Sequence, residues 1–269
     1  MSKIGIVIPV LDLSWMTINL LESIKDTVDM SGVWIVIVDN GSSDKETKAV
    51  RDWLGENWDG DYKYSYSPKP LGFVKAVNIG MQECKNLDYF IVMNNDTLVT
   101  HGWLERLIDT LKKDDVGLVG PVSSPPDWRE LPMGKSFIEQ KLKYKQISGS
   151  LNGFTKQLIQ HFDGVEQGLD FIAFYCVGMK TKIVQEIGQL DEIYNLGLFD
   201  DDDYCHRIKQ AGYKIVLRRD VYVHHYHNST FLEKHGKEKY MELLEENRKI
   251  FKKKWGIDPW DRCKKPEAI

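Results

Sequence analysis

Four aspartates, Asp200 to Asp203, stand in a row where the pattern predicts the start of a helix. Carboxylates near a helix N-terminus gain about 0.3–1 kcal/mol each from the helix dipole, which accounts for one or two of them. A third and a fourth add repulsion between like charges, so capping alone explains the run poorly. Repulsion raises the pKa of a carboxyl group, and a raised pKa suits a base that takes a proton from a hydroxyl group. The run therefore suggests a general base, with helix capping as the alternative.

Polar side chains also follow three of the predicted strands, at the point where each strand ends. These strand ends are Pro9 to Asp12, Asp39 with Asn40, and Asn94 to Asp96. Each of them alone could be an ordinary turn, because Asp, Asn, Gly and Ser are common turn residues. In open α/β sheets, however, ligands bind beyond the carboxyl ends of the strands. Three polar ends at one sheet edge favour a ligand site over three independent turns.

Phosphate-binding loops of the common kinds are missing from the sequence. It contains no GxxxxGK[ST] motif and no GxGxxG after the first strand, which argues against a P-loop enzyme and a dinucleotide dehydrogenase. A nucleotide ligand would then need another partner for its phosphate charge. Mg²⁺ or Mn²⁺ could serve, because these cations prefer oxygen ligands. Asp96, at the end of a buried strand, is the best candidate for holding the cation.

Three histidines, His224, His225 and His227, follow a strand-like run. They could be surface residues, or one of them could complete a cation site centred on Asp96. Side chains alternate between the faces of a strand, so His224 and His225 should point in opposite directions and only one can reach the cation. A pure zinc site is not favoured, because no cysteines accompany the histidines.

Strand and helix patterns alternate along the first half of the chain. Apolar and alternating runs predict strands in the segments 4–10, 33–44, 62–67, 89–96 and 116–122, of which the second ends in polar loop residues and the fourth runs into an acidic residue. Apolar residues that recur every three or four positions predict helices at 14–28, 72–84 and 102–113. This alternation is typical of an α/β fold, in which helices flank a mostly parallel sheet.

The pattern weakens after Val122, and residues 123–169 are expected to form an irregular insertion. Aromatic residues in this segment, Trp128 among them, could offer surfaces to a ligand, and the segment could equally be a tether or an interface. Regular structure is predicted to resume with the segments 171–178, a helix from about Thr181, 213–227, and an amphipathic helix from Phe231 to Trp255.

The composition narrows the class of protein. The 269 residues are 42% hydrophobic, enough for the core of one large domain or two small ones. The net charge is −4 and the basic residues are dispersed, which argues against a nucleic-acid partner. The densest basic run, "RKIFKKKW", is interpreted as a solvated helix face, with contact to a membrane surface or an acidic partner as the alternative.

Cysteine usage and the apolar runs bear on the compartment. The four cysteines include no CxxC pair, which is typical of reduced thiols. The first apolar run is too short for a signal peptide, and no later run reaches the length of a transmembrane helix. We therefore expect a cytoplasmic protein without a transmembrane segment, for which peripheral membrane contact stays open.

Seven motifs occur in one order over residues 4–231: "IVIPV", "VDNGSSD", "LGFVKAVNIGM", "FIVMNNDTLV", "VGM", "FDDDDYCHRIKQAGYKI" and "VYVHHYHNSTF". With these motifs in this order, the chain resembles family 2 glycosyltransferases of the GT-A fold. The resemblance implies a Rossmann-like sheet and an inverting transfer of a sugar from a nucleotide-diphosphate sugar, dependent on Mn²⁺ or Mg²⁺. The acceptor would be a hydroxyl group of a glycan or of a lipid-linked molecule, in the synthesis of a polysaccharide or glycan.

The resemblance assigns a set of residues to the donor nucleotide. They are Pro9, Asp12, Asp39, Asn40, Gly41, Gly72, Lys75, Asn78, Asn94 and Asn95. Asp39 would hydrogen-bond the nucleoside. The sequence Asn94-Asn95-Asp96 stands where the family has its DxD motif, so that Asp96 keeps the metal role and Asn94 would contact ribose or phosphate.

The same resemblance assigns roles within the acidic run. The family's general base falls on Asp201, and Asp200 stands where the family usually has Glu, as an acceptor contact or cap. Asp203 and Arg207 are four residues apart on one helix face and can form an ion pair. Asp202 is expected to be solvated.

Two further positions follow from the family pattern. Gly178 matches a small residue near the donor sugar. Either His224 or His225 matches the histidine that closes the metal site, and His224 is preferred because its distance to Ser229 fits the family's spacing.

The resemblance also suggests a division of the chain. Residues 1–230 would form the GT-A domain, with a nucleotide-binding half (1–122), the insertion (123–169) and an acceptor and catalytic half (170–230), followed by a helical extension (231–269). Two alternatives remain at this point. A nucleotidyltransferase that makes activated sugars would carry a glycine-rich loop near the N-terminus, and a non-catalytic sugar- or nucleotide-binding module would not need the acids.

Overall fold

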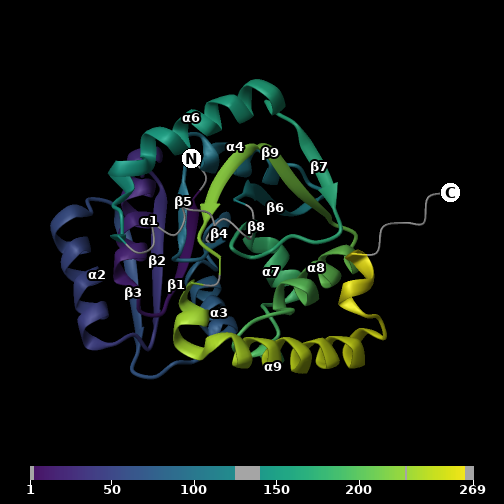
Figure 1. Ribbon diagram of the computed structural model, residues 1–269. Helices are drawn as coiled ribbons and strands as arrows, with labels where there is room; N and C mark the ends of the chain where they lie inside the picture. Colours follow the sequence, from purple (N-terminus) through teal and green to yellow (C-terminus); the bar gives the residue numbers. More distant parts are fainter. Residues whose placement is uncertain (1–2, 125–139, 228, 264–269) are drawn as a thin grey trace.

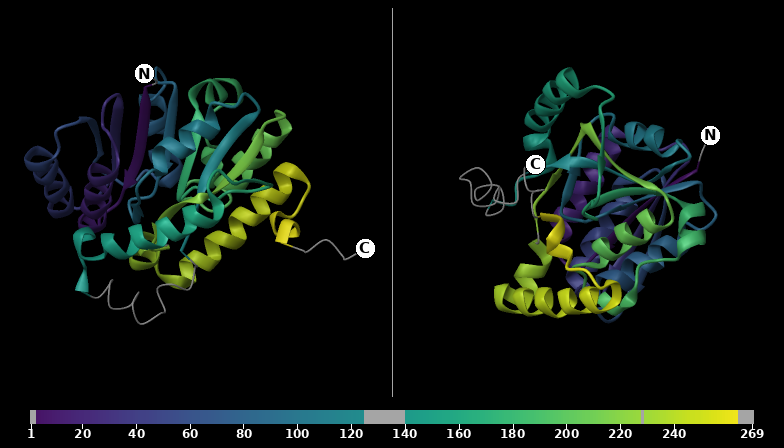
Figure 2. Two further views of the ribbon diagram at one scale, coloured as in Figure 1. Left: turned by 90° about the horizontal axis from the view of Figure 1, so that it is seen from above. Right: turned by 90° about the vertical axis from the view of Figure 1, so that its right-hand side faces the viewer.

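The computed structural model describes residues 3–124, 140–227 and 229–263 of the chain (Figure 1). Within these ranges a nine-stranded sheet forms the centre of the molecule, and helices cover both of its faces (Figures 1 and 2). The strands are β1 (Ile4–Val10), β2 (Val33–Asn40), β3 (Asp61–Ser67), β4 (Tyr89–Met93), β5 (Thr97–Val99), β6 (Val116–Ser123), β7 (Glu166–Leu169), β8 (Cys176–Lys180) and β9 (Lys214–His225). The helices are α1 (Ser14–Thr27), α2 (Asp44–Asn57), α3 (Phe73–Glu83), α4 (Trp103–Leu111), α6 (Tyr144–Phe162), α7 (Thr181–Ile187), α8 (Asp200–Gln210) and α9 (Ser229–Trp255), with 3-10 helices η2 (Glu192–Tyr194) and η3 (Pro259–Cys263).

The strand order is β3-β2-β1-β4-β8-β6-β9-β5, and β7 pairs with β9. Strands β3, β2, β1 and β4 are parallel, so their carboxyl ends meet at one edge of the sheet. Strand β8 runs antiparallel between β4 and β6, while β6 and β9 are parallel. The predicted α/β fold is confirmed, and the antiparallel pairings beyond β4 make the sheet mixed.

The core lies in two layers, one on each face of the sheet. Ile6 and Ile8 of β1 pack in the layer that contains α1 and α4, whereas Val7 packs in the layer that contains α3, α7 and α8. All three side chains are fully buried. Burial on both faces explains why β1 has a continuous apolar run instead of an alternating one.

Helix α2 was not predicted from the sequence. Only Val50 and Leu54 of its residues are buried, and they lie four positions apart. A single pair of apolar positions is too short a stripe to reveal helical periodicity in a charged segment. The helix forms because this pair packs against the core layer on the α1 side.

The expectation of an irregular insertion at 123–169 was wrong for the part that the structure describes. This part contains the 19-residue helix α6 and strand β7. Helix α6 buries few of its own residues, chiefly Tyr144 and Thr155, so its apolar stripe is weak. Trp128 lies outside the described residues.

Two other predicted elements differ in their bounds. Strand β8 begins at Cys176, so residues 171–175 approach it as a loop instead of forming part of the strand. Helix α9 begins at Ser229 and is interrupted at Gly236, which has a left-handed φ of 74°. Such a φ is accessible to glycine without steric cost, so Gly236 can separate two helical segments.

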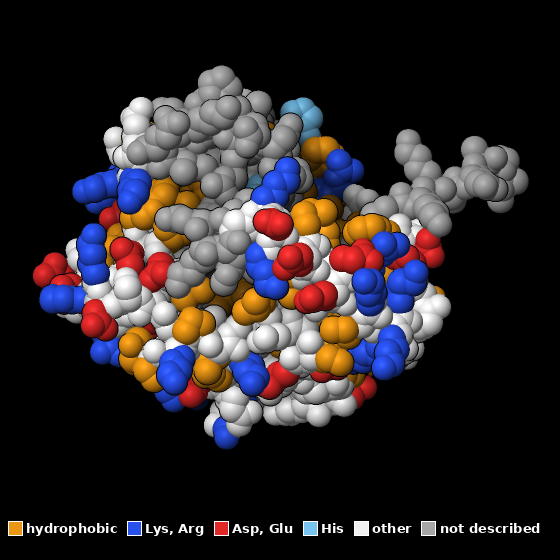
Figure 3. Space-filling model, turned by 60° about the horizontal axis from the view of Figure 1, so that its bottom comes forward, with side chains coloured by type: hydrophobic (Ala, Val, Ile, Leu, Met, Phe, Trp, Pro, Cys, Tyr) orange, Lys and Arg blue, Asp and Glu red, His pale blue; other side chains and the backbone are white. Residues whose placement is uncertain are grey.

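The described surface carries both signs of charge. On the face turned forward in Figure 3, acidic and basic side chains are interspersed, as the totals of 36 Lys and Arg and 40 Asp and Glu would suggest. In the part of the chain that the structure describes, no helix combines the length and the apolar character needed to cross a membrane.

Candidate active site

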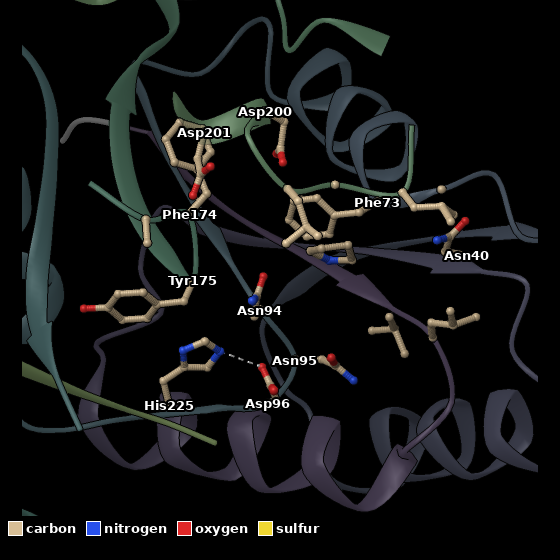
Figure 4. A pocket seen from close by; sticks show the side chains of 18 of the residues that line it. Asn40, Phe73, Asn94, Asn95, Asp96, Phe174, Tyr175, Asp200, Asp201 and His225 are labelled. Atoms are coloured by element: carbon tan, nitrogen blue, oxygen red, sulfur yellow. Dashed lines mark ion pairs between the residues drawn. The ribbon is translucent and has the colours of Figure 1, made fainter. Parts of the chain in front are cut away.

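The carboxyl edge of β1, β2 and β4 borders a cavity of about 430 Å³ (Figure 4). Residues proposed from the sequence that line this cavity are Pro9, Asn40, Gly72, Asn94, Asn95, Asp96, Asp200, Asp201 and His225. They come from three strand ends, from the starts of α3 and α8, and from the end of β9. The ends of all three strands therefore meet at one edge, and β2 and β4 each bring polar side chains to the cavity, whereas β1 brings Pro9 and not the polar Asp12.

The turn after β4 is held by hydrogen bonds from both sides. The Asn94 amide donates to the carbonyl oxygen of Tyr175 at 2.9 Å, and the Tyr226 amide donates to the carbonyl oxygen of Asp96 at 3.0 Å. The side-chain amide of Asn95 donates to Thr17 Oγ1 of α1 at 3.1 Å. Segments from β8, β9 and α1 thus fix the backbone that carries Asp96.

Asp96 and His225 form a buried pair in the cavity wall. His225 Nε2 lies 3.2 Å from Asp96 Oδ1, and the Asp96 residue is 4% exposed. The imidazole ring stacks on Tyr175, with ring centroids 5.0 Å apart and an interplanar angle of 13°. The Tyr175 hydroxyl donates to the Pro121 carbonyl oxygen at 2.6 Å, which holds the stacking ring in place.

The structure places His225, and not the preferred His224, in the cavity lining beside Asp96. His224 is adjacent to His225 on β9, and its Nδ1 lies 2.9 Å from the Tyr222 hydroxyl, away from the cavity lining. Burial lowers the pKa of His224 to about 3, so its ring is neutral at ordinary pH. The alternation argument was sound, since one histidine reaches the site. The motif spacing to Ser229 favoured His224, but this spacing does not report which face of β9 turns toward Asp96.

The Asp96–His225 pair fits two positions of a divalent-cation site. Both ring nitrogens of His225 are buried, and apart from the approach of Nε2 to Asp96 Oδ1 neither has a polar partner among the described residues. A carboxylate oxygen and a neutral imidazole nitrogen are both suitable ligands for Mn²⁺. No cluster of three or more His, Cys, Asp or Glu side chains suited to a metal occurs in the described ranges. A bound molecule or water would supply further ligands.

Asp200 and Asp201 face the same cavity from the first turn of α8. In Figure 4 they lie across the cavity from Asp96 and His225, with Asn94 between them. Asp200 is 3% exposed, and burial, with the negative charge of Asp201, raises its pKa well above the usual range. Asp201 is half-buried, and its Oδ1 accepts a hydrogen bond from the Asp202 amide at 3.0 Å. The pair therefore combines an acid that tends to keep its proton with a neighbouring carboxylate.

The other two aspartates of the run are structural. Asp203 is fully buried, and Arg207 Nε donates to its Oδ2 at 3.0 Å, so the predicted ion pair is confirmed. Asp203 Oδ1 also accepts from Trp255 Nε1 of α9 at 2.8 Å and lies 2.6 Å from Lys254 Nζ. The expectation that Asp202 is solvated was wrong, because this residue is only 6% exposed. The packing of α8 against the sheet covers more of the helix than its charged sequence indicated.

We expect Asp203→Asn to lower the free energy of unfolding by about 3 kcal/mol or more. The change keeps the shape of the side chain but leaves Arg207 and Lys254 without their shared counter-charge in a largely buried site. Urea denaturation followed by circular dichroism would measure it. Asp170→Asn is the matched control, because Asp170 pairs with Lys209 on the surface and should contribute at most about 1 kcal/mol. Equal effects of the two changes would contradict this assignment.

Asp39 does not line the cavity, although the sequence predicted that it contacts the nucleoside. It is fully buried, and its carboxylate already accepts three hydrogen bonds, from the Ser42 amide, Thr47 Oγ1 and the Tyr64 hydroxyl, at 2.9, 2.6 and 2.7 Å. These contacts shape the loop after β2. The neighbouring Asn40 is the residue of this strand end that reaches the cavity.

Asp12 and Gly41 join the loops after β1 and β2. The Asp12 amide donates to Ser42 Oγ at 2.8 Å, and Asp12 Oδ1 accepts from the Ser43 amide at 2.8 Å. Gly41 has a φ of +84°, and a Cβ atom there would lie 2.4 Å from the Pro70 nitrogen. Neither residue lines the cavity, so both act on it through the loop backbone.

Lys75, Asn78 and Gly178 also lie away from the cavity lining. Lys75 is exposed, with its ammonium 3.7 Å from Glu192. The Asn78 side chain exchanges two hydrogen bonds with the backbone of Leu190 and so ties α3 to the segment before η2. Gly178 is in the middle of β8, where a Cβ atom would lie 2.9 Å from Ile91, so the packing of the sheet accounts for its small size.

Sequence reasoning missed the apolar part of the cavity wall. These residues are Val10, Leu11, Pro70, Phe73, Ala173, Phe174, Tyr175, Leu196, Leu198 and Tyr240. Most of them lie in loops, where apolar residues follow no periodic pattern. One signal was present: Leu196 to Leu198 directly precede the acidic run, and the chain must pass the same cavity to place Asp200 there.

Solved structures with the same fold are glycosyltransferases. A mannosyltransferase, PcManGT from Pyrobaculum calidifontis, in complex with GDP-Man and Mn²⁺, superposes with a TM-score of 0.64 at 15% identity, over 90% of this chain and 60% of that one. GalNAc-T7 with UDP, GalNAc and Mn²⁺ gives a TM-score of 0.61 at 15% identity, over 84% of this chain and 44% of that one. TarS from S. aureus gives 0.58 at 14% identity, over 86% of this chain and 62% of that one. At these identities the likeness shows the fold alone.

Sequence comparisons point the same way. An uncharacterized protein, y4gI of Sinorhizobium fredii, is 22% identical over 235 residues, which are 84% of this chain and 25% of that protein. This chain therefore spans about a quarter of the length of that relative. The sequence model of glycosyl transferase family 2 matches residues 6–180, well over half of the 269 residues, and the chain belongs to glycosyl transferase family 2.

Proposed function

We propose that this protein transfers a sugar from a nucleotide-diphosphate sugar to an acceptor hydroxyl group, with inversion at the anomeric carbon. The observation that supports this function best is that two groups of side chains, each containing an acid, face each other across one cavity. Asp96 with His225 lies on one side, and Asp201 with Asp200 on the other. The first group suits a diphosphate with its cation, and the second suits deprotonation of a hydroxyl group.

The donor nucleotide would lie along the strand ends. Pro9 and Asn40 border that end of the cavity, and Asn94 offers an amide beside the position of the phosphates. The side-chain oxygen of Asn94 is buried without a hydrogen-bond partner among the described residues, which leaves it available to accept a hydrogen bond from ribose. Mn²⁺ or Mg²⁺ bound by Asp96 and His225 would supply positive charge beside the diphosphate leaving group.

Asp201 is proposed as the general base. It takes the proton of the acceptor hydroxyl while that oxygen forms a bond to the anomeric carbon and the bond from this carbon to the diphosphate breaks. The nucleoside diphosphate leaves from the opposite face, which inverts the configuration. Burial and the negative charge of Asp201 raise the pKa of the neighbouring Asp200. In its protonated form Asp200 can donate a hydrogen bond into the cavity.

The acceptor would be a glycan or a lipid-linked molecule. Phe73, Phe174 and Tyr240 add aromatic surface to the cavity, and aromatic faces pack well against the C–H groups of sugars. We also propose the division of the chain into a nucleotide-binding half (1–122) and an acceptor half (170–230), since the two groups of acids come from these parts.

A panel of nucleotide sugars with Mn²⁺ tests this function. Release of nucleoside diphosphate would identify the donor, and thermal shifts with UDP, GDP and other nucleoside diphosphates would identify the base. NMR of the glycosidic product would establish its configuration. A product that retains the donor's configuration would contradict the single-displacement mechanism.

We expect His225→Ala to weaken Mn²⁺-dependent binding of the nucleoside diphosphate by roughly 10-fold or more. His224→Ala is the matched control, because its ring is bonded to Tyr222 and lies outside the cavity lining. It should change this affinity by less than about two-fold while lowering stability. Calorimetry with and without Mn²⁺ would measure both. A larger loss of affinity in His224→Ala would restore the assignment made from the sequence.

A further inference from the structure

A single side-chain amide of α9 binds the backbone of the loop that leads into α8. Asn247 is 3% exposed, and its Nδ2 lies 3.3, 2.7 and 3.1 Å from the carbonyl oxygens of Tyr194, Gly197 and Leu198. One NH₂ group thus serves three acceptors in a buried setting. Carbonyl groups that converge in this way would repel each other without a shared donor.

This loop has an unfavourable backbone conformation. Asn195, Leu198 and Phe199 have φ values of 40°, 71° and 65°, in the left-handed region that disfavours residues with a Cβ atom. Gly197 also has a positive φ, of 102°. Residues held in such conformations persist only where the surrounding structure holds them. The left-handed turns direct the chain so that Leu198 and Asp200 both line the cavity.

Helix α9 also contacts the first turn of α8, which follows the loop in the chain. Trp255 Nε1 donates to Asp203 Oδ1 at 2.8 Å, and Lys254 Nζ lies 2.6 Å from the same atom. The loop carbonyls and the Asp203 carboxylate lie on either side of Asp200 and Asp201 in the chain. The position of the two cavity acids is therefore bracketed by contacts from one helix.

We propose that Asn247 is a positioning residue, which holds the strained loop 194–199 so that Asp201 is placed against the acceptor hydroxyl. The claim that Asn247 holds the loop is structural and rests on the loop geometry. The claim that this places Asp201 for catalysis rests on the proposed function. It makes α9 part of the catalytic framework, where the sequence suggested only a helical extension. Asn247 itself does not line the cavity.

The structural part is tested by hydrogen–deuterium exchange of the full-length protein. Asn247→Leu removes the donor, and Asn247→Asp keeps the shape but turns oxygen atoms toward the carbonyl groups. Both should speed exchange of the Gly197 and Asp203 amides, which donate to Tyr194 and Phe199 at 2.9 and 3.0 Å. Leu243→Ala is the matched control, because Leu243 is buried on the same helix, one turn earlier. In Leu243→Ala, the Gly197 and Asp203 amides should exchange at the same rates as in the unchanged protein.

The catalytic part is tested by separating turnover from donor binding. We expect both Asn247 variants to lower kcat by roughly 10- to 100-fold, since small misplacements of a catalytic group have effects of this size. Their Kd for the nucleoside diphosphate with Mn²⁺ should stay within about two-fold, because the carbonyl groups that Asn247 contacts lie in the loop before α8 and not at the strand ends proposed to bind the nucleotide. A variant that is only destabilised would recover full kcat at a temperature well below its Tm.

The possible results distinguish a failure of the role proposed for Asn247 from a failure of the proposed function. Unchanged loop exchange in both Asn247 variants would overturn the proposal, whatever the enzyme catalyses. Faster loop exchange with unaltered kcat would overturn the positioning role. An unchanged protein that releases no nucleoside diphosphate from any donor would instead refute the proposed function, and exchange alone would then decide whether Asn247 holds the loop.

Discussion

Asp201→Asn should lower kcat by about 10²- to 10⁴-fold, the range expected when a general base is lost. Asparagine keeps the shape of the side chain and removes the basic oxygen atom. The Kd of the nucleoside diphosphate with Mn²⁺ should change by less than about two-fold, because Asp201 lies across the cavity from Asp96 and His225. Initial rates of donor consumption with a saturating acceptor would measure the first quantity, and calorimetry the second.

Asp202→Asn is the matched control for this change. Asp202 is the next residue in the same run and is also an acid, but it does not line the cavity. Its replacement should leave kcat within about three-fold of the original value at temperatures where the variant is folded. Near-normal turnover in Asp201→Asn, or an equal loss in Asp202→Asn, would remove Asp201 from the role of base.

Asp96→Ala should weaken Mn²⁺-dependent binding of the nucleoside diphosphate by roughly 100-fold or more, since the carboxylate is the only acidic group on that side of the described cavity lining. The affinity measured in the presence of a chelator should change much less. Titration calorimetry with UDP and GDP, with Mn²⁺ or with EDTA, would separate the two effects.

Asp114→Ala provides the control for Asp96→Ala. The Asp114 side chain is fully exposed and precedes β6, at the opposite edge of the sheet from the cavity. It should leave binding unchanged. If Asp96→Ala binds with the same Mn²⁺ dependence as the unchanged protein, the cation site is not at the end of β4.

In the acidic run, some contacts follow from the local spacing of the residues, and others form only in the tertiary structure. The pKa of its first aspartate is raised, because α8 is packed so that Asp200 is buried beside Asp201. Its fourth pairs with Arg207, as the four-residue spacing predicted, and also with Lys254, and it accepts a hydrogen bond from Trp255. The spacing could not predict these last two contacts. Four adjacent acids are therefore tolerated because they are not four adjacent free charges.

The sequence alone determined the features that depend on short-range periodicity and on strand direction. The buried run of β1 indicated a strand covered on both faces, and helices α1, α3 and α4 were visible as apolar stripes. The polar ends of β1, β2 and β4 indicated a shared site, because parallel strands that are neighbours must end at one edge. These inferences need only the repeat of each element and the order of the elements.

Only the tertiary structure decided which side chains face the cavity. His225 and not His224 approaches Asp96, since the pairing of β5 with β9 sets which face of β9 turns inward. Asp39 is saturated by Ser42, Thr47 and Tyr64, and Gly178 serves the packing of the sheet. Asn247 reaches a loop about fifty residues away in the chain. The direction in which a side chain faces, and the distant residue that it contacts, follow from strand register and packing. No local pattern of residues encodes these.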